Sequence, residues 1–438
     1  MNGDSLASDP GSIELAGRRI ASRAGSASDL IDASLARIAT VDSRVQGWCS
    51  VDRRGARTQA ERLDEEASRG PLRGPLHGVP VAIKDVIDVA GWPTRAGSRT
   101  RAGAQPATGD AQIVLALRAA GAVILGKAHT TEFAYFDGPP PTRNPHNLAH
   151  TPGGSSAGPA AVVAAGMVPL SVGTQTAGSV SRPAAYCGIA AFKPSTLSWS
   201  AQGIVPFAPG FDTPGLFAHR VADVAIAARA LMPPFLVRPS MPVSRSLRIG
   251  IIEDAILESA SDTVRQSIRA ATDKIEAAGH AVAQTRSLVP LAKLTEWHKT
   301  MIEYELARVH PQLVDAPADD VTPALRAAVE RGRMIHDASY IDARRAVSEA
   351  RNAFWSAVDS FDALVFPAAP DAAPVGMKTG DPRFIVPFTA LGGPIVSVPV
   401  AMTSERLPLG LMLLGAPGSD WQMLSISEQL APSFELAR

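Results

Sequence analysis

Two glycine-rich segments, GGSSAG at 153–158 and GTQTAGS at 173–179, lie on either side of the small-residue run PAAVVAAGMV. This run predicts a helix that packs closely, and PLSVGTQT after it predicts a strand leading into the second segment. Both segments therefore fall at the ends of elements, where active sites are usually built. Their glycine content exceeds what ordinary core packing needs and indicates close approach of the backbone to a site.

The flanking sequence predicts an α/β fold. HGVPVAIKDVIDVAG predicts a buried strand around Lys84, and residues 110–135 predict a helix, a strand and a second helix in HTTEFAYF. Residues 12–42 predict two amphipathic helices separated at Gly25, with Ser26 and Asp29 as a capping box for the second. Such alternation favours a single large sheet flanked by helices.

The chain divides at changes in composition. Residues 1–231 contain both glycine-rich segments, and the proline-rich stretch 232–246 predicts an exposed connection. Residues 247–360 begin with LRIGIIED, which predicts a strand, and the rest of this region is predicted to be mostly helical. We expect it to form a substrate cap. Strand-like runs return in 361–438, including FTALGGPIVSVPVAM, and are expected to complete the sheet.

Composition excludes several function classes. Lysine plus arginine equals aspartate plus glutamate at 42 each, and aromatic residues make up 5%, so neither nucleic acid nor an anionic membrane is an expected partner. Two cysteines, Cys49 and Cys187, argue against a disulfide scaffold, and no histidine pair has metal-site spacing. The N-terminus lacks a signal-peptide pattern. We expect a cytoplasmic protein, monomeric or homodimeric, without metal or cofactor.

The serines and the lysine together suggest nucleophilic catalysis. A serine hydroxyl needs a neutral base, and lysine serves only when burial lowers its pKa from ~10.4 by about three units, or roughly 4 kcal/mol. Lys84 is the best candidate, and Ser155 on its glycine-rich loop can relay the proton. Ser179 is the predicted nucleophile, and small Ala177 and Gly178 leave backbone N–H groups free to stabilise an oxyanion.

Each feature alone also has a structural interpretation. GGSS is a common turn, a strand lysine often extends its ammonium into solvent, and Ser179 could cap a helix. Cys187 is expected to be a packed small residue, and His129 and His146 to hydrogen-bond loop backbone or to line the pocket. The joint occurrence, in this order, favours catalysis.

Three stretches make the chain resemble the amidase signature family: GVPVAIKD (78–85), NPHNLAHTPGGSSAGPAAVVAAG (144–166) and VGTQTAGSVSRPAAYCGIAAFKPS (172–195). The resemblance implies a mixed sheet between helical layers and a Ser, cis-Ser, Lys triad. Lys84 would be the base, Ser155 the relay with a cis peptide bond, and Ser179 the acylated residue. It also implies oxyanion donors from the backbone of Thr176, Ala177, Gly178 and Ser179.

The chain departs from the family's common pattern GTDTGGSIRIPA. Gln175 replaces the aspartate, Ala177 a glycine and Ser181 the arginine, while an arginine follows one place later as Arg182. That arrangement is more similar to malonamidase and to amidases of broad range than to relatives that recognise glutamine. Gln175 and Arg182 are therefore predicted to contact substrate, with a loop-holding role for Arg182 as the alternative.

These observations predict a hydrolase that cleaves an amide C–N bond through an acyl-enzyme on Ser179, releasing a carboxylic acid and an amine or ammonia. Esters and carbamates are further expected substrates, and an uncharged small molecule is preferred. The first alternative is a glutamine-dependent amidotransferase A-type subunit. The second is an inactive homologue that only binds.

Overall fold

The computed structural model describes residues 5–237 and 246–434. Its centre is one mixed sheet of 11 strands in the order β1-β3-β2-β4-β6-β5-β10-β11-β9-β7-β8. The strands are β1 Trp48–Val51, β2 Pro80–Lys84, β3 Val123–Ala128, β4 Leu170–Gln175, β5 Ala190–Lys193, β6 Thr213–Ala218, β7 Arg248–Glu253, β8 Ala281–Arg286, β9 Ala363–Pro367, β10 Ile395–Met402 and β11 Pro408–Leu414. The predicted α/β class, with one large mixed sheet flanked by helices, is confirmed.

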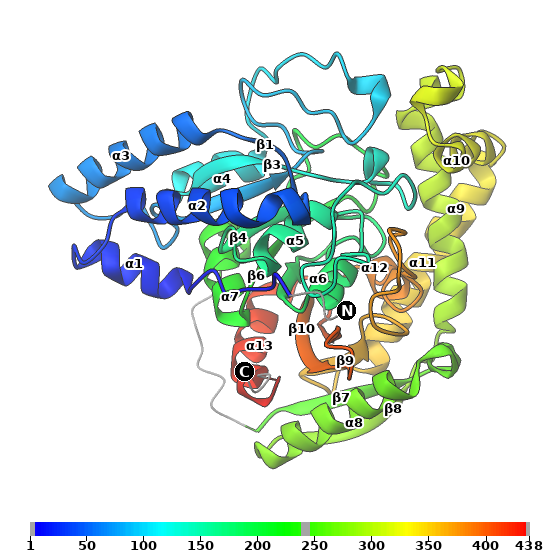
Figure 1. Ribbon diagram of the computed structural model, residues 1–438. Helices are drawn as coiled ribbons and strands as arrows, with labels where there is room; N and C mark the ends of the chain where they lie inside the picture. The colour runs from blue at the N-terminus through cyan, green and yellow to red at the C-terminus, as the bar shows by residue number, and fades with distance from the viewer. Residues whose placement is uncertain (1–4, 238–245, 435–438) are drawn as a thin grey trace.

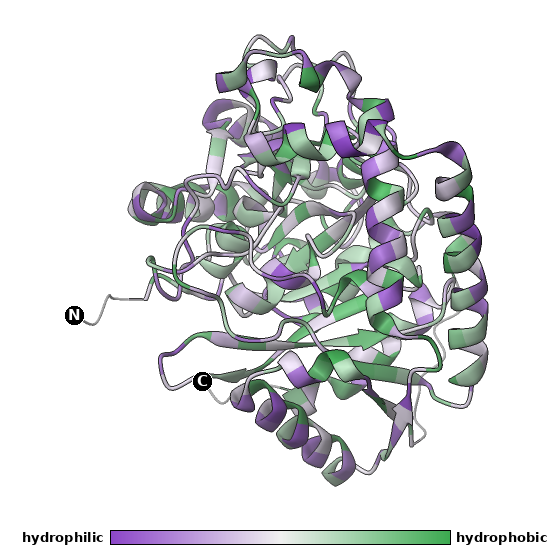
Figure 2. Ribbon diagram, turned by 90° about the vertical axis from the view of Figure 1, so that its right-hand side faces the viewer, coloured by the Kyte–Doolittle hydropathy of each residue, from purple (hydrophilic) through white to green (hydrophobic). Residues whose placement is uncertain are grey.

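Helices cover both faces of the sheet (Figure 1). One layer contains α2 Ala27–Val45, α3 Arg53–Arg69, α5 Ala157–Ala164 and α6 Ser181–Cys187. The opposite layer contains α1 Ile13–Ala21, α4 Gln112–Ala119, α7 Val221–Leu231, α8 Asp262–Ala277 and α13 Asp420–Phe434. Figure 2 shows apolar strands in the interior and helices that carry polar residues outward.

A third group of helices stands at one side of the molecule in Figure 1. It consists of α9 Leu291–Val309, α10 Pro323–Arg333 and α11 Asp337–Ala357, with the short α12 Val386–Ala390 packed against α9. Short 3-10 turns complete the described elements: η1 Arg99–Arg101, η2 Glu132–Ala134, η3 Pro234–Leu236, η4 Ala255–Ser259, η5 Pro311–Val314 and η6 Ala318–Asp320. No described helix is long and apolar enough to cross a membrane.

Strand β2 shows how the sheet positions a lysine at its end. All five residues of PVAIK are buried, and because side chains alternate along a strand, Val81 and Ile83 join one hydrophobic core while Ala82 joins the other. Parallel pairing with β3 and β4 places the C-terminal ends of all three strands at the same edge. Lys84 therefore ends its strand beside the end of β4.

The predicted capping box at Ser26 and Asp29 is confirmed at the start of α2. The prediction of a helix in HTTEFAYF is wrong. Only the turn η2 forms, and Phe133 and Ala134 have positive φ angles of 47° and 59°. Tertiary contacts override helix propensity because the Glu132 carboxylate accepts from the Ser98 hydroxyl at 2.7 Å and from the distant Thr322 N–H at 2.8 Å.

Two further differences concern the second half of the chain. The mostly helical stretch contains β8, an edge strand parallel to β7 whose residues are largely exposed, so AVAQTR lacks the apolar run that predicts a strand. The segment beginning FTALGG is helical over α12 before β10 starts. Of the predicted connection 232–246, residues 238–245 lie outside the described part.

Candidate active site

Lys84 is fully buried at the end of β2. Its Nζ atom lies 2.8 Å from Ser155 Oγ and 2.8 Å from Thr174 Oγ1, so its hydrogen-bond partners are two hydroxyls and not a carboxylate. Burial lowers the pKa of Lys84 to about 7, and attraction to the buried Asp212 opposes this shift. A substantial share of the lysine is therefore neutral near pH 7.

The glycine-rich loop at 153–158 brings Ser155 to this lysine. Gly153 adopts a positive φ of 82°, and the Gly154–Ser155 peptide bond is cis. Ser156 ties the loop to β4, since its hydroxyl donates to Thr174 O at 3.2 Å and accepts from Thr174 N at 3.3 Å. A Cβ on Gly158 would lie 2.4 Å from His129 N, so α5 approaches the end of β3 only without a side chain there.

Ser179 lies between the end of β4 and the start of α6, with 6% of its surface exposed. Within the described residues its hydroxyl makes no hydrogen bond, and neither do the backbone N–H groups of Ala177, Gly178 and Ser179. Unpaired N–H groups in so buried a loop are unusual and are what an oxyanion hole requires.

Gln175 is fully buried, and the protein uses both ends of its side-chain amide. Its oxygen accepts from Val180 N at 2.9 Å and from Ser181 N at 3.0 Å, which satisfies the first turn of α6. Its nitrogen donates to Thr389 Oγ1 at 2.9 Å. An aspartate could accept in the same way but could not donate, so this contact depends on the glutamine. Its predicted contact with substrate stays a prediction.

Arg182 is likewise fully buried, and its guanidinium joins two loops. It donates to Gly154 O at 2.7 Å, directly before Ser155, and to Gly380 O at 3.0 Å, while its Nε atom has no partner. Burial lowers its pKa to about 10, with opposing attraction from Tyr186 and Asp381. These contacts have the form of the loop-holding role, and substrate binding by Arg182 stays a prediction.

Asp212 holds the loop between β4 and Ser179. Its carboxylate accepts from Thr176 Oγ1 at 2.5 Å and from the N–H groups of Phe207 at 2.7 Å and Ala208 at 3.0 Å. Burial raises its pKa, and these hydrogen bonds act in the opposite direction. The carboxylate thereby links the Thr176 hydroxyl to the 207–208 backbone.

Several residues around the site were not predicted from the sequence. Thr174 lies inside the GTQTAGS segment, so its position was a usable signal. Asp212, His298 and Thr389 carried none, because each reaches the loop at 175–179 from a distant part of the chain. His298 Nε2 lies 2.8 Å from Thr176 O, and Thr389 Oγ1 donates to Ala177 O at 2.5 Å.

The other residues that the sequence singles out are not members of the predicted triad of Lys84, Ser155 and Ser179. Cys187 is buried, with Sγ 3.4 Å from Pro152 O, and His146 Nε2 lies 3.0 Å from Cys187 O. His129 Nδ1 lies 3.2 Å from Cys49 Sγ. Across the described residues, no three His, Cys, Asp or Glu side chains gather as metal ligands would.

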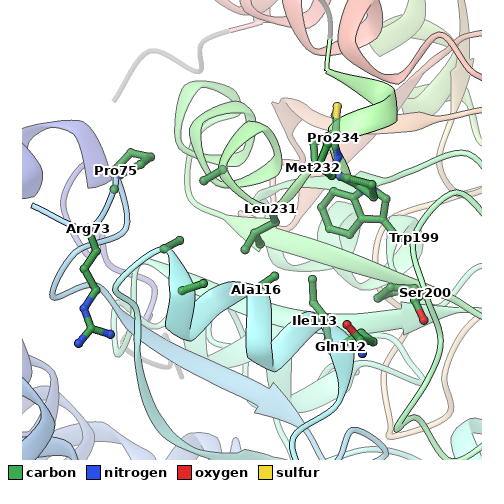
Figure 3. Close-up of a pocket in the computed structure, with 16 residues that line it drawn as sticks. Arg73, Pro75, Gln112, Ile113, Ala116, Trp199, Ser200, Leu231, Met232 and Pro234 are labelled. Carbon is green, nitrogen blue, oxygen red and sulfur yellow. The ribbon is translucent and has the colours of Figure 1, made fainter.

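A surface cavity of about 530 Å³ is lined by none of Lys84, Ser155 and Ser179. It is lined by residues of α4 and of the end of α7, with Arg73 and Trp199 among its walls (Figure 3). The predicted catalytic residues therefore do not open into this cavity.

Comparisons with known proteins match nearly the whole chain. A family model described as Amidase matches residues 29–424. The A-type subunit of the glutamyl-tRNA(Gln) amidotransferase from Salinispora arenicola (strain CNS-205) is 33% identical, with 95% of this chain and 96% of that protein covered.

Solved structures share the fold over the same extent. A peptide amidase from Stenotrophomonas maltophilia is 27% identical with a TM-score of 0.84, covering 98% of this chain and 97% of that one. A protein from a vestigial complex, described as revealing the origins of an s-triazine catabolic enzyme, is 28% identical with a TM-score of 0.87, covering 97% and 98%.

Proposed function

Because the chain belongs to the Amidase family, we propose that it cleaves an amide C–N bond through an acyl-enzyme on Ser179. The observation that supports this most is the contact between Lys84 and Ser155, where a buried lysine with a pKa of about 7 lies 2.8 Å from a serine hydroxyl. A neutral amine in that position can accept a proton through the hydroxyl.

In the proposed reaction, Ser179 Oγ attacks the carbonyl carbon of the amide. Its proton passes to Ser155 Oγ while Ser155 gives its own proton to Lys84 Nζ, so the relay serine ends neutral. The carbonyl oxygen becomes an oxyanion that accepts from the backbone N–H groups of Ala177 and Gly178, and Thr176 and Ser179 are further predicted donors.

Collapse of the intermediate breaks the C–N bond. The proton held by Lys84 returns through Ser155 to the departing nitrogen, which leaves as ammonia or an amine. Water then attacks the ester on Ser179 by the same relay, which releases the carboxylic acid and regenerates the serine. Esters and carbamates present the same carbonyl and are expected to react as well.

Two roles in metabolism use this chemistry, and different observations favour them. The relative from Salinispora arenicola is the A-type component of an amidotransferase, which supports an assembly in which this chain releases ammonia from an amide donor such as glutamine. This identity over almost the full length supports the amidotransferase role more directly than a free-standing amidase.

A free-standing amidase is the second candidate. Gln175, Ala177 and Arg182 differ from the family's common pattern at the loop beside the nucleophile, and the peptide amidase shares the fold over 98% of this chain. A neutral small-molecule amide is the substrate class that we propose for this role.

Hydrolysis by the purified chain separates the two roles. Ammonia release would be measured from glutamine and from a panel of primary, aryl and peptide amides, with esters and carbamates alongside and Ser179→Ala as control. Turnover of simple amides by the isolated chain supports the amidase. Release from glutamine only when the other amidotransferase components are added supports the amidotransferase role. Failure of a fluorophosphonate to label the chain would favour an inactive homologue.

A further inference from the structure

Three consecutive carbonyl groups before Ser179 are each held by a group outside their loop. Thr176 O accepts from His298 Nε2 of α9 at 2.8 Å. Ala177 O accepts from Thr389 Oγ1 of α12 at 2.5 Å. Gly178 O accepts from Arg182 N in the first turn of α6 at 3.0 Å. The orientation of three successive peptide planes is therefore fixed from outside the loop.

Fixing a carbonyl also fixes the N–H group of the next residue. Among the described residues, the only cis peptide bond is Gly154–Ser155, so the planes from Thr176 to Ser179 are trans. In a trans peptide the C=O and N–H groups point in opposite directions. The N–H groups of Ala177, Gly178 and Ser179 thus face away from the three anchoring groups, and they donate to nothing else in the described part of the chain.

We infer that His298 and Thr389 are positioning residues that orient the oxyanion hole. The inference rests on the proposed function, because it concerns the same acyl transfer on Ser179. Neither side chain needs to contact substrate. Each holds the carbonyl group of a peptide whose N–H group points the opposite way, towards the oxyanion.

The chemical state of His298 suits this role. A carbonyl oxygen only accepts, so the hydrogen of the neutral ring must lie on Nε2. The side chain is 1% exposed, and its ring lies 4.5 Å from the ring of Phe211, measured between centroids. Burial lowers the pKa of His298 to about 4, so the ring is a neutral donor throughout the neutral pH range.

The hydroxyl of Thr389 is directed by Gln175. Because the Gln175 amide nitrogen donates to Thr389 Oγ1, the hydroxyl hydrogen is left to point at Ala177 O. The amide oxygen of Gln175 simultaneously holds the N–H groups of Val180 and Ser181 on the other side of the nucleophile. One glutamine thereby supports both flanks of Ser179.

Helix α9 thereby has a direct part in the site. Glu305, two turns after His298 on the same helix, accepts from Gly210 N at 2.7 Å and so also holds the loop that leads into Asp212. Helix α9 therefore contacts Thr176, directly after β4, and also Gly210, in the loop that leads into Asp212. The helical region 247–360 would then complete the oxyanion hole, in addition to any role in covering the substrate.

The test compares variants that remove a donor with variants that keep one. His298→Phe preserves the ring packing and loses the donor, whereas His298→Gln retains a donor. Thr389→Val is close in shape to threonine and loses the hydroxyl, whereas Thr389→Ser retains it. Lys299→Gln, at an exposed position of the same helix, is the matched control. The probes are a fluorophosphonate, whose rate of labelling is followed, and phenylboronic acid, which forms an anionic tetrahedral adduct with a serine.

We expect His298→Phe and Thr389→Val to label at least about tenfold more slowly and to bind phenylboronic acid at least about tenfold more weakly. His298→Gln and Thr389→Ser should recover most of both losses. Labelling within about twofold of wild type in folded His298→Phe or Thr389→Val would overturn the inference. Thr389→Val decides alone if His298→Phe does not fold. Wild-type protein that fails to react with the fluorophosphonate would overturn the proposed function itself, which is a distinguishable result.

Discussion

The Nζ atom of Lys84 lies 2.8 Å from the Oγ atom of Ser155, and the nearest partners of the lysine are hydroxyl groups. A lysine paired with a carboxylate would keep its proton, whereas this one is buried among neutral partners and has a pKa of about 7. Burial makes the amine a usable base, and its contact with Ser155 places it next to the group that would carry the proton.

The first prediction concerns pH. Lys84 must be neutral to accept a proton, so kcat/KM for an uncharged amide should rise about tenfold per pH unit below the pKa and level off above about pH 7. Initial rates between about pH 5 and 9 measure this profile. A rate that does not change across neutral pH, or that rises only near the ordinary lysine pKa, would argue against Lys84 as the base.

The second prediction is that Lys84→Met inactivates the protein and stabilises it. A pKa lowered from 10.5 to about 7 corresponds to roughly 4 to 5 kcal/mol of unfavourable burial of the charged form. Losing the hydrogen bonds to Ser155 and Thr174 offsets about half of that. We expect the free energy of unfolding at neutral pH to rise by about 1 to 3 kcal/mol, measured by urea denaturation.

The pH dependence of the stability gained by Lys84→Met provides a control for this prediction. Between the folded pKa of about 7 and the unfolded value of 10.5, the unfolded chain holds a proton on Lys84 that the folded chain lacks. Wild-type stability therefore gains from this group as pH rises through that window. The difference in free energy of unfolding between Lys84→Met and wild type should therefore shrink as pH rises. A Lys84→Met variant that is less stable than wild type at pH 7 would contradict this prediction.

The third prediction concerns Gln175. Gln175→Met leaves Val180 N and Ser181 N without an acceptor and Thr389 without its donor, which should lower the free energy of unfolding by about 2 to 4 kcal/mol. The activity should fall as well, since the flanks of Ser179 are released. Gln284→Met at an exposed position of β8 is the control. A fully stable Gln175→Met variant whose only defect is a raised KM would instead support direct contact with substrate.

The fourth prediction concerns Arg182. Arg182→Met removes the donor that joins Gly154 O to Gly380 O, so the loop carrying Ser155 should lose its position. We expect kcat/KM to fall by about 10- to 100-fold for neutral amides and for amides that carry a carboxylate. Comparison of the two substrate classes checks this. A loss confined to the carboxylate-bearing class, seen in KM, would show that Arg182 binds the substrate's charge.

The candidate site could be predicted from short sequence motifs. Lys84, Ser155 and Ser179 lie in segments whose glycines and small residues are recognisable without knowledge of distant contacts, and parallel pairing of β2 with β4 explains why the segments meet. The roles assigned to the three side chains remain predictions about chemistry. The mixed sheet could be predicted because buried apolar strands such as β2 have a local signature.

Contacts between distant residues were not predictable in this way. Gln175 has the appearance of a polar residue facing a substrate, but its orientation depends on Thr389, which is 214 positions away. His298 lies 122 positions from Thr176, within a helix whose periodicity shows only that one side is buried. Likewise, η2 replaces a predicted helix because Glu132 is held by residues from outside its segment.

The most direct test of the proposed chemistry is to trap the acyl-enzyme and find the residue that carries it. The purified chain would be mixed with an activated amide or ester, quenched in acid during turnover, digested and analysed by mass spectrometry. We predict the added acyl mass on Ser179, with no adduct and no turnover in Ser179→Ala. An acyl group on Ser155, or normal turnover by Ser179→Ala, would contradict the proposed mechanism.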